Sequence, residues 1–123
     1  MLPCGMTFTQ PEPIPSSAPQ ISRVDSINTP IGTNGQVEVL FRLDRQFNAW
    51  EFHFAKETSP SYAIVVAHRH IEVRSDAEAV AAVVAEVNTW LDQTHADARS
   101  DRSKAVEALR TAERELDAVN LLF

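Results

Sequence analysis

Residues 75–119 decide the fold, and they read SDAEAVAAVVAEVNTWLDQTHADARSDRSKAVEALRTAERELDAV. The stretch opens on a capping-box pattern, in which the Ser75 hydroxyl can accept from the Glu78 N–H while the Glu78 carboxylate accepts from the Ser75 N–H. This pattern predicts a helix that begins near residue 76. Apolar side chains then recur at helical spacing and form one stripe, which comprises Val80, Val83, Val84, Val87 and Leu91.

A second apolar stripe lies further along, with spacings that alternate between four and three: Ala105, Leu109, Ala112, Leu116, Val119 and Phe123. Between the stripes, residues 94–103 are polar but contain no glycine or proline that would end a helix. Two interpretations therefore remain open. Ser100 or Ser103 caps a second helix, so that two long helices form a hairpin, or one helix runs from about residue 76 to 119. The polar connection favours the hairpin. The single helix is favoured by a seven-residue series of small and apolar side chains: Ala77, Val84, Leu91, Ala98, Ala105, Ala112 and Val119.

Upstream of the helices, a period of two predicts β-strands. Residues 37–43 carry an apolar side chain at every second position, from Val37 to Leu43, as a strand with one buried face does. Residues 50–55 place three aromatic side chains on one side, which predicts the second strand of an antiparallel hairpin. A β-branched run at 62–66 predicts a further strand that can extend to Val73, and residues 21–31 can add an edge strand.

Proline and glycine divide the chain into two regimes. Six of the seven prolines and all three glycines precede residue 36. Residues 1–20 are therefore expected to form a flexible, Pro-rich arm, and residues 21–123 a single domain. The predicted fold class is α+β: an antiparallel three- to four-stranded β-meander (strands at about 36–73) followed by two long amphipathic helices (about 76–120), as a hairpin or as one long helix.

Composition and charge limit the function classes. The 123 residues carry a net charge of -6, so the excess positive charge that attracts nucleic acid or an anionic membrane surface is absent. The single cysteine, Cys4, cannot form an internal disulfide, and the first residues lack the basic and apolar regions of a signal peptide. We therefore expect a cytoplasmic, acidic protein that binds neither nucleic acid nor membrane.

Sequence motifs for the common enzyme chemistries are missing. No glycine follows Gly35, so neither a P-loop nor a dinucleotide-binding fingerprint is present, and no cofactor is expected. A metal-site hypothesis rests on His68, His70 and Glu72, which share one face of an extended chain, with His53 on the neighbouring predicted strand. Such a site would belong to a metal-dependent enzyme. The simpler interpretation is a strand that turns polar near its end.

Basic and aromatic side chains support a different hypothesis, a site for a small anionic or phosphate-bearing ligand. Guanidinium and imidazole groups bind phosphate by hydrogen bonds, and aromatic rings stack on a ligand. The candidate ligand-binding residues are Arg42, Arg69, His68, His70 and Trp50. The simpler interpretation is that these charges pair with carboxylates at the surface of the sheet.

Apolar surface that exceeds what a small sheet can cover favours a third interpretation, assembly with other protein chains. Two long amphipathic helices leave part of their stripes uncovered, and a homo-oligomer, a dimer or higher, is the common way to cover them. The candidate interface residues are Trp90, Leu109, Leu116, Leu121, Leu122 and Phe123. We therefore favour a small non-catalytic, homo-oligomeric interaction protein (an adaptor, inhibitor or chaperone-like accessory factor) over a ligand-binding or sequestering protein, and over an enzyme.

Overall fold

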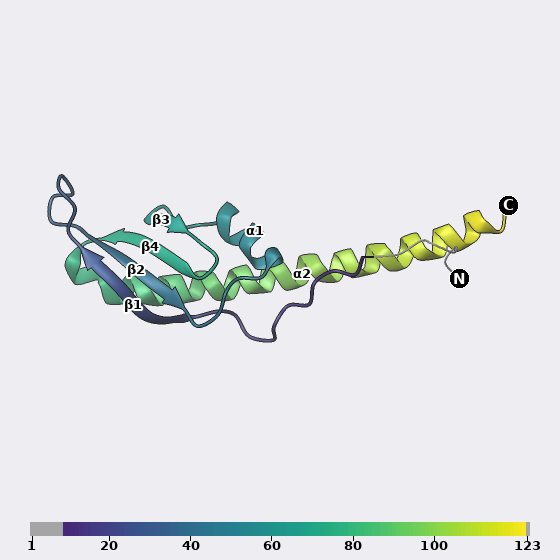
Figure 1. Ribbon diagram of the computed structural model, residues 1–123, viewed down its shortest axis with the longest axis horizontal. Helices are drawn as coiled ribbons and strands as arrows, with labels where there is room; N and C mark the ends of the chain where they lie inside the picture. Colours follow the sequence, from purple (N-terminus) through teal and green to yellow (C-terminus); the bar gives the residue numbers. More distant parts are fainter. Residues whose placement is uncertain (1–8, 123) are drawn as a thin grey trace.

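A computed structural model describes residues 9–122 and confirms the α+β fold class (Figure 1). An antiparallel sheet of four strands precedes one long helix, and a shorter helix lies between the second and third strands. In chain order the elements are β1 (Ile21–Asn28), β2 (Val37–Leu43), α1 (Ala49–Glu57), β3 (Ala63–Val66), β4 (His70–Ser75), a 3-10 helix (Ala77–Ala79) and α2 (Val80–Asn120). The expectation for residues 1–8 lies outside the described part of the chain.

The strands follow the order β1-β2-β4-β3, and each neighbouring pair is antiparallel. The prediction for 37–43 is confirmed as β2, and the added edge strand is confirmed as β1. The order departs from a simple meander because β2 pairs with β4. The strand expected to run from 62 to 73 is two strands, joined by a tight turn in which the Ala67 N–H donates to the His70 carbonyl oxygen over 2.9 Å.

The strand predicted over residues 50–55 is wrong, because these residues belong to α1. A complete capping box begins this helix: the Asn48 side chain accepts from the Glu51 N–H, and the Glu51 carboxylate accepts from the Asn48 N–H. Phe47, Glu51 and Ala55, four residues apart, are all buried. This helical face therefore outweighs the aromatic alternation, and α1 packs against α2.

The helical hairpin is also wrong, and the single-helix alternative is confirmed: α2 runs without interruption for 41 residues, about 60 Å at 1.5 Å per residue. The polar connection continues the helix because Thr94, His95 and Ala98 are buried along α2. The capping box expected at residue 75 does not form. Ser75 is the last residue of β4, and its hydroxyl donates to the Asp76 carbonyl oxygen over 2.8 Å.

The hydrophobic core lies between the sheet and the first half of α2 (Figure 1). Alternate side chains of the two central strands point into it, and one face of α2 closes it. Its fully buried members include Val39, Phe41, Leu43, Ile71, Val73, Val87 and Leu91. Burying a side chain of this size contributes about 1.5–3 kcal/mol, so this layer is what holds α2 to the sheet.

The rest of α2 projects from the sheet, and we call residues 99–120 the distal half (Figure 1). Ala98 is the last buried residue of the helix. The N-terminal segment, residues 9–20, runs alongside α2 toward the sheet and leads into β1 (Figure 1). Among the described residues, no helix combines the length and apolar character required to cross a bilayer.

Candidate functional site

The basic ligand candidates on the sheet are engaged with an aspartate. The Arg42 Nε donates to one Asp25 oxygen over 3.0 Å, and the His70 Nε2 lies 3.0 Å from the same oxygen. Arg23 binds the other oxygen over 2.8 Å. Desolvation acts to raise the pKa of Asp25, but hydrogen bonds from His70 and Arg23 outweigh it and hold the pKa below its ordinary value. Arg42 and His70 therefore belong to an ionic cluster on the open face of the sheet.

The other ligand candidates lie elsewhere. His68 stacks on the Phe52 ring of α1, with 4.1 Å between ring centroids. The Arg69 side chain donates to the Leu43 carbonyl oxygen over 3.3 Å, and Trp50 is a half-buried residue of α1. The five candidates thus divide between the sheet face and the surroundings of α1, and residues 9–122 line no pocket.

The metal candidates are not assembled either. His53 lies on α1, where its Nε2 is 3.5 Å from the Glu57 carboxylate of the same helix. His70 and Glu72 lie on β4, and His68 in the turn before it. Burial and the neighbouring Glu38 carboxyl raise the pKa of Glu72. No three metal-binding side chains come together within the described part of the chain.

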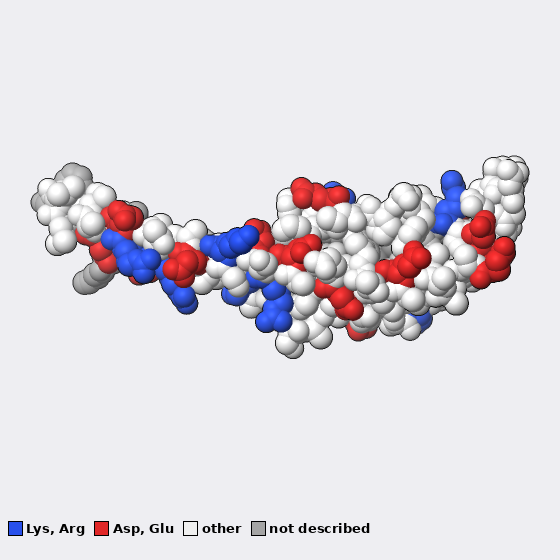
Figure 2. Space-filling model, turned by 180° about the vertical axis from the view of Figure 1, so that it is seen from behind, with Lys and Arg blue, Asp and Glu red and all other residues white. Residues whose placement is uncertain are grey.

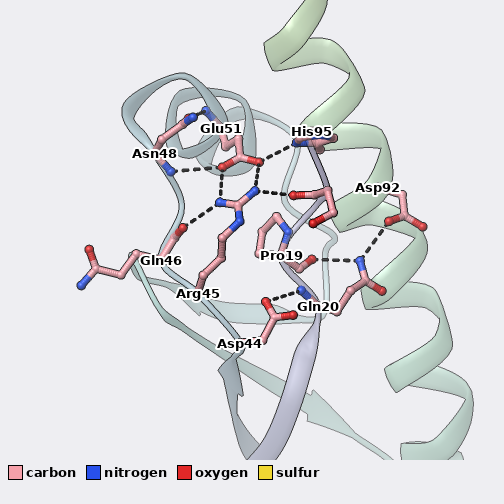
Figure 3. A network of polar contacts seen from close by, with 10 residues as sticks. Pro19, Gln20, Asp44, Arg45, Gln46, Asn48, Glu51, Asp92 and His95 are labelled. Atoms are coloured by element: carbon pink, nitrogen blue, oxygen red, sulfur yellow. Dashed lines mark hydrogen bonds and ion pairs between the residues drawn. The ribbon is translucent and has the colours of Figure 1, made fainter. Parts of the chain in front are cut away.

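A buried ionic network that the sequence did not reveal centres on Glu51, whose side chain is 0% exposed (Figure 3). Arg45 binds both carboxylate oxygens, with Nη1–Oε1 and Nη2–Oε2 distances of 2.8 and 2.9 Å. On the other side the His95 Nδ1 lies 2.8 Å from Oε2. Burial acts to raise the pKa of the Glu51 carboxyl, but hydrogen bonds from Arg45 and His95 outweigh it and hold the pKa below its ordinary value.

The contributors to this network come from three separate parts of the chain. Arg45 follows β2, Asn48 and Glu51 begin α1, and His95 lies near the middle of α2. A carboxylate that orients an imidazole is also the arrangement of a general-base pair. Here both side chains are buried, and among the described residues the His95 Nε2 has no hydrogen-bond partner. The geometry therefore fits a structural staple that joins α1, α2 and the end of β2.

The N-terminal segment is attached to the same network (Figure 3). The Arg45 Nη2 donates to the Ser17 carbonyl oxygen over 2.7 Å, and Pro19 is buried. The Gln20 side chain donates to Asp92 of α2 over 2.9 Å. Further along α2, Arg102 binds the carbonyl oxygens of residues 11 and 12 over 3.3 and 2.8 Å. Residues 11–20 are thus held against α2 by named polar contacts.

The interface candidates fall in two environments. Trp90 packs edge-on against Phe47 with 6.4 Å between ring centroids, and its Nε1 donates to the Thr58 hydroxyl over 3.1 Å, so its ring takes part in the contact between α1 and α2. The remaining described candidates lie on or just after the distal half: Leu109 and Leu116 are half-buried, and Leu121 and Leu122 are 87% and 81% exposed. Phe123 lies outside the described residues.

The distal half and the two residues after it therefore combine half-buried and exposed apolar side chains with many charges. Acidic and basic side chains are interspersed along the projecting helix (Figure 2). Glu107 forms two ion pairs along the helix, with Arg110 one turn away over 3.5 Å and with Arg114 two turns away over 3.9 Å. Exposed pairs of this kind contribute only about 0.3–0.5 kcal/mol, so packing against another chain is the larger source of stability open to this helix.

One sequence signal could have revealed part of the network. Asn48 and Glu51 have the spacing of a capping box, and a helix beginning there would have placed Glu51 on a buried face. His95 gives no comparable signal, because its partner is 44 positions away along the chain.

Comparison with known proteins identifies no relative: no family model, no curated protein and no solved structure matches this chain.

Proposed function

We propose that this chain is a small non-catalytic, homo-oligomeric interaction protein, an adaptor, inhibitor or chaperone-like accessory factor, that acts by binding protein. The observation that supports the proposal is the distal half of α2. It extends about 33 Å beyond the last buried residue of the helix, at 1.5 Å per residue, and it carries a stripe of apolar side chains. A helix with such a stripe gains stability by packing the stripe against another chain.

The sheet and the staple around Glu51 supply a rigid base for this projection. The contact of α1 with α2 and the attached N-terminal segment hold the first half of α2 in place. The direction of the distal half is thereby set before a partner binds, which lowers the entropic cost of association. A cytoplasmic location is part of the proposal, because a chain with the single cysteine Cys4 needs no oxidising compartment.

The second candidate function is a small-ligand-binding or sequestering protein that holds an anionic ligand with Arg42, Arg69, His68 and His70 at an oligomer interface. Only the clustering of Arg42 with His70 on the open face of the sheet supports it. Asp25 already neutralises that cluster, so a phosphate would have to compete with a bound carboxylate. The first proposal is therefore the better supported.

Native mass spectrometry and sedimentation equilibrium of the full chain test the proposal. We expect an oligomer without added mass, and we expect Leu109→Glu with Leu116→Glu to dissociate it because each substitution places a charge in the apolar stripe. Thr111→Glu with Ala118→Glu adds the same charge at exposed positions of the same helix outside the stripe, and serves as the matched control. An oligomer that retains the added mass of a small molecule would favour the ligand-binding alternative, and a monomer would refute both candidates.

A further inference from the structure

The apolar stripe of the distal half has a regular composition. Along it, alanine and leucine alternate at spacings of four and three residues: Ala105, Leu109, Ala112 and Leu116. This is the spacing of the a and d positions of a coiled coil, with leucine at one position and alanine at the other. Small side chains at every second position let a facing helix approach closely, provided that the partner offers a large side chain opposite each small one.

The charges of the distal half are distributed unevenly along its length. Residues 99–110 contain four basic and two acidic side chains, whereas residues 111–120 contain one basic and three acidic side chains. The first part therefore carries a net charge of +2 and the second part -2. Two copies of such a helix attract each other when they run in opposite directions, and they place like charges together when they run in the same direction.

We propose that the partner of the distal half is a second copy of this chain, packed antiparallel, with a two-fold axis that passes between residues 110 and 111. This inference rests on the proposed function and specifies its partner. An interface that is complementary to itself is what a two-fold dimer requires, because the same patch serves on both sides. Both the charges and the apolar stripe of this one helix meet that condition.

An axis at this position satisfies two features of the sequence. A division between residues 110 and 111 leaves a net charge of +2 before it and -2 after it, so an axis there sets each basic part against the acidic part of the second copy. The same axis brings Ala105 opposite Leu116 of the second copy, and Leu109 opposite Ala112 of the second copy. Leu109 and Leu116 then each face an alanine of the second copy. The pattern of volumes and the distribution of net charge are thus both satisfied in this register.

Distances between spin labels on the full-length protein test the orientation. In a Cys4→Ser background, one variant carries the label at Thr111→Cys and another at Ala118→Cys, and both are exposed positions of α2 seven residues apart. In the proposed dimer the two labels at residue 111 are separated along the axis by about 2 Å, and those at 118 by about 22 Å, at 1.5 Å per residue. In a parallel dimer both variants give the same distance.

Charge reversal supplies a second readout. Glu113→Lys with Glu115→Lys makes the acidic part basic, so we expect the dissociation constant of the dimer to rise at least tenfold in low salt. Adding Arg99→Glu with Lys104→Glu to the same chain exchanges the two parts, and self-association is then expected to recover. Glu57→Lys with Glu78→Lys changes the net charge equally at exposed positions outside the distal half, and should leave the dimer unchanged.

Each outcome decides between the inference and the function on which it rests. A longer distance at 118 than at 111 supports the antiparallel dimer. Equal distances in a dimer overturn the antiparallel pairing and leave a homo-oligomeric interaction protein standing. A monomer at all concentrations overturns both. If the full chain is a monomer and dimerises only after removal of residues 1–8, the stripe of the full chain is covered by its own N-terminus. That outcome also overturns the proposal.

Discussion

Glu51 and His95 face each other across the contact between the two helices, with 2.8 Å between the carboxylate Oε2 and the imidazole Nδ1. The contact joins positions 44 residues apart and occupies the place where α2 leaves the core. Because an ionised carboxylate can only accept hydrogen bonds, the Nδ1 carries the proton whenever Glu51 is charged. The Glu51 carboxylate thus accepts from the Asn48 N–H at the start of α1, from His95 of α2 and from the guanidinium of Arg45.

Replacing Glu51 should lower the stability of the folded protein. Glu51→Gln removes the charge that faces Arg45 and His95 in a buried setting, and we expect the free energy of unfolding to fall by about 3 kcal/mol. Urea denaturation followed by circular dichroism measures the change. Glu57→Gln, an exposed substitution on the same helix, should stay within about 0.5 kcal/mol of the parent. Equal stability of the two variants would show that the network contributes nothing.

Acid should destabilise the protein through the same carboxyl. The pKa of Glu51 in the folded state lies below its ordinary value of 4.5, so the folded state binds fewer protons than the unfolded state in this range. The stabilisation is therefore complete above pH 4.5 and is lost as the pH falls from there through the lowered value. Unfolding free energies measured at neutral pH and at about pH 3 test this sign. In Glu51→Gln, the loss between the two pH values should be smaller.

Asn48 should contribute more to the free energy of unfolding than Glu78, although the sequence pattern predicted a capping box at Glu78. Asn48→Ala removes the side chain that accepts from the Glu51 N–H, and we expect a loss of about 1 kcal/mol in unfolding free energy. Glu78→Ala removes the partner in the capping box predicted at residue 75, which does not form, so its cost should be under about 0.5 kcal/mol. A larger loss for Glu78→Ala than for Asn48→Ala would contradict this assignment.

Arg102 should hold the N-terminal segment against α2. Arg102→Ala removes the donors to the carbonyl oxygens of residues 11 and 12, so backbone motion at Glu12 and Ile14 should increase on the nanosecond timescale. Heteronuclear relaxation of these amides measures it. Arg110→Ala removes an exposed guanidinium two turns further along and is the matched control. Unchanged relaxation in Arg102→Ala would show that other contacts hold the segment.

The sequence predicted the sheet well because a strand with one buried face must alternate its side chains. The alternation in β2 is visible in residues 37–43, and the buried positions are the apolar ones. It failed at α1, where aromatic residues at every second position imitate a strand. What decides between strand and helix there is the burial of Glu51, where the Arg45 guanidinium pairs with the carboxylate charge and the His95 Nδ1 lies within hydrogen-bond distance of it.

The same reasoning explains the uncertainty about α2. Residues 94–103 are polar enough to end a helix, and their continuation depends on Thr94 and His95 being buried beside α1. That contact is tertiary and has no local signature. For the candidate sites, sequence could name the apolar residues of the distal half. It placed Trp50 and His53 on a strand where the structure has α1, and it allowed one strand to run from 62 to 73, whereas His68 lies in the turn before β4. These two differences separate several of the ligand and metal candidates.

The projection of α2 also governs how the molecule moves through solvent. A chain of 13.7 kDa with a projecting helical extension of about 33 Å experiences more friction than a sphere of equal mass. Its apparent mass in gel filtration will therefore exceed that of a compact protein of the same mass. Sedimentation equilibrium depends on mass alone, so a difference between the two methods reports the elongation. Self-association along the distal half would lengthen the particle further and widen that difference.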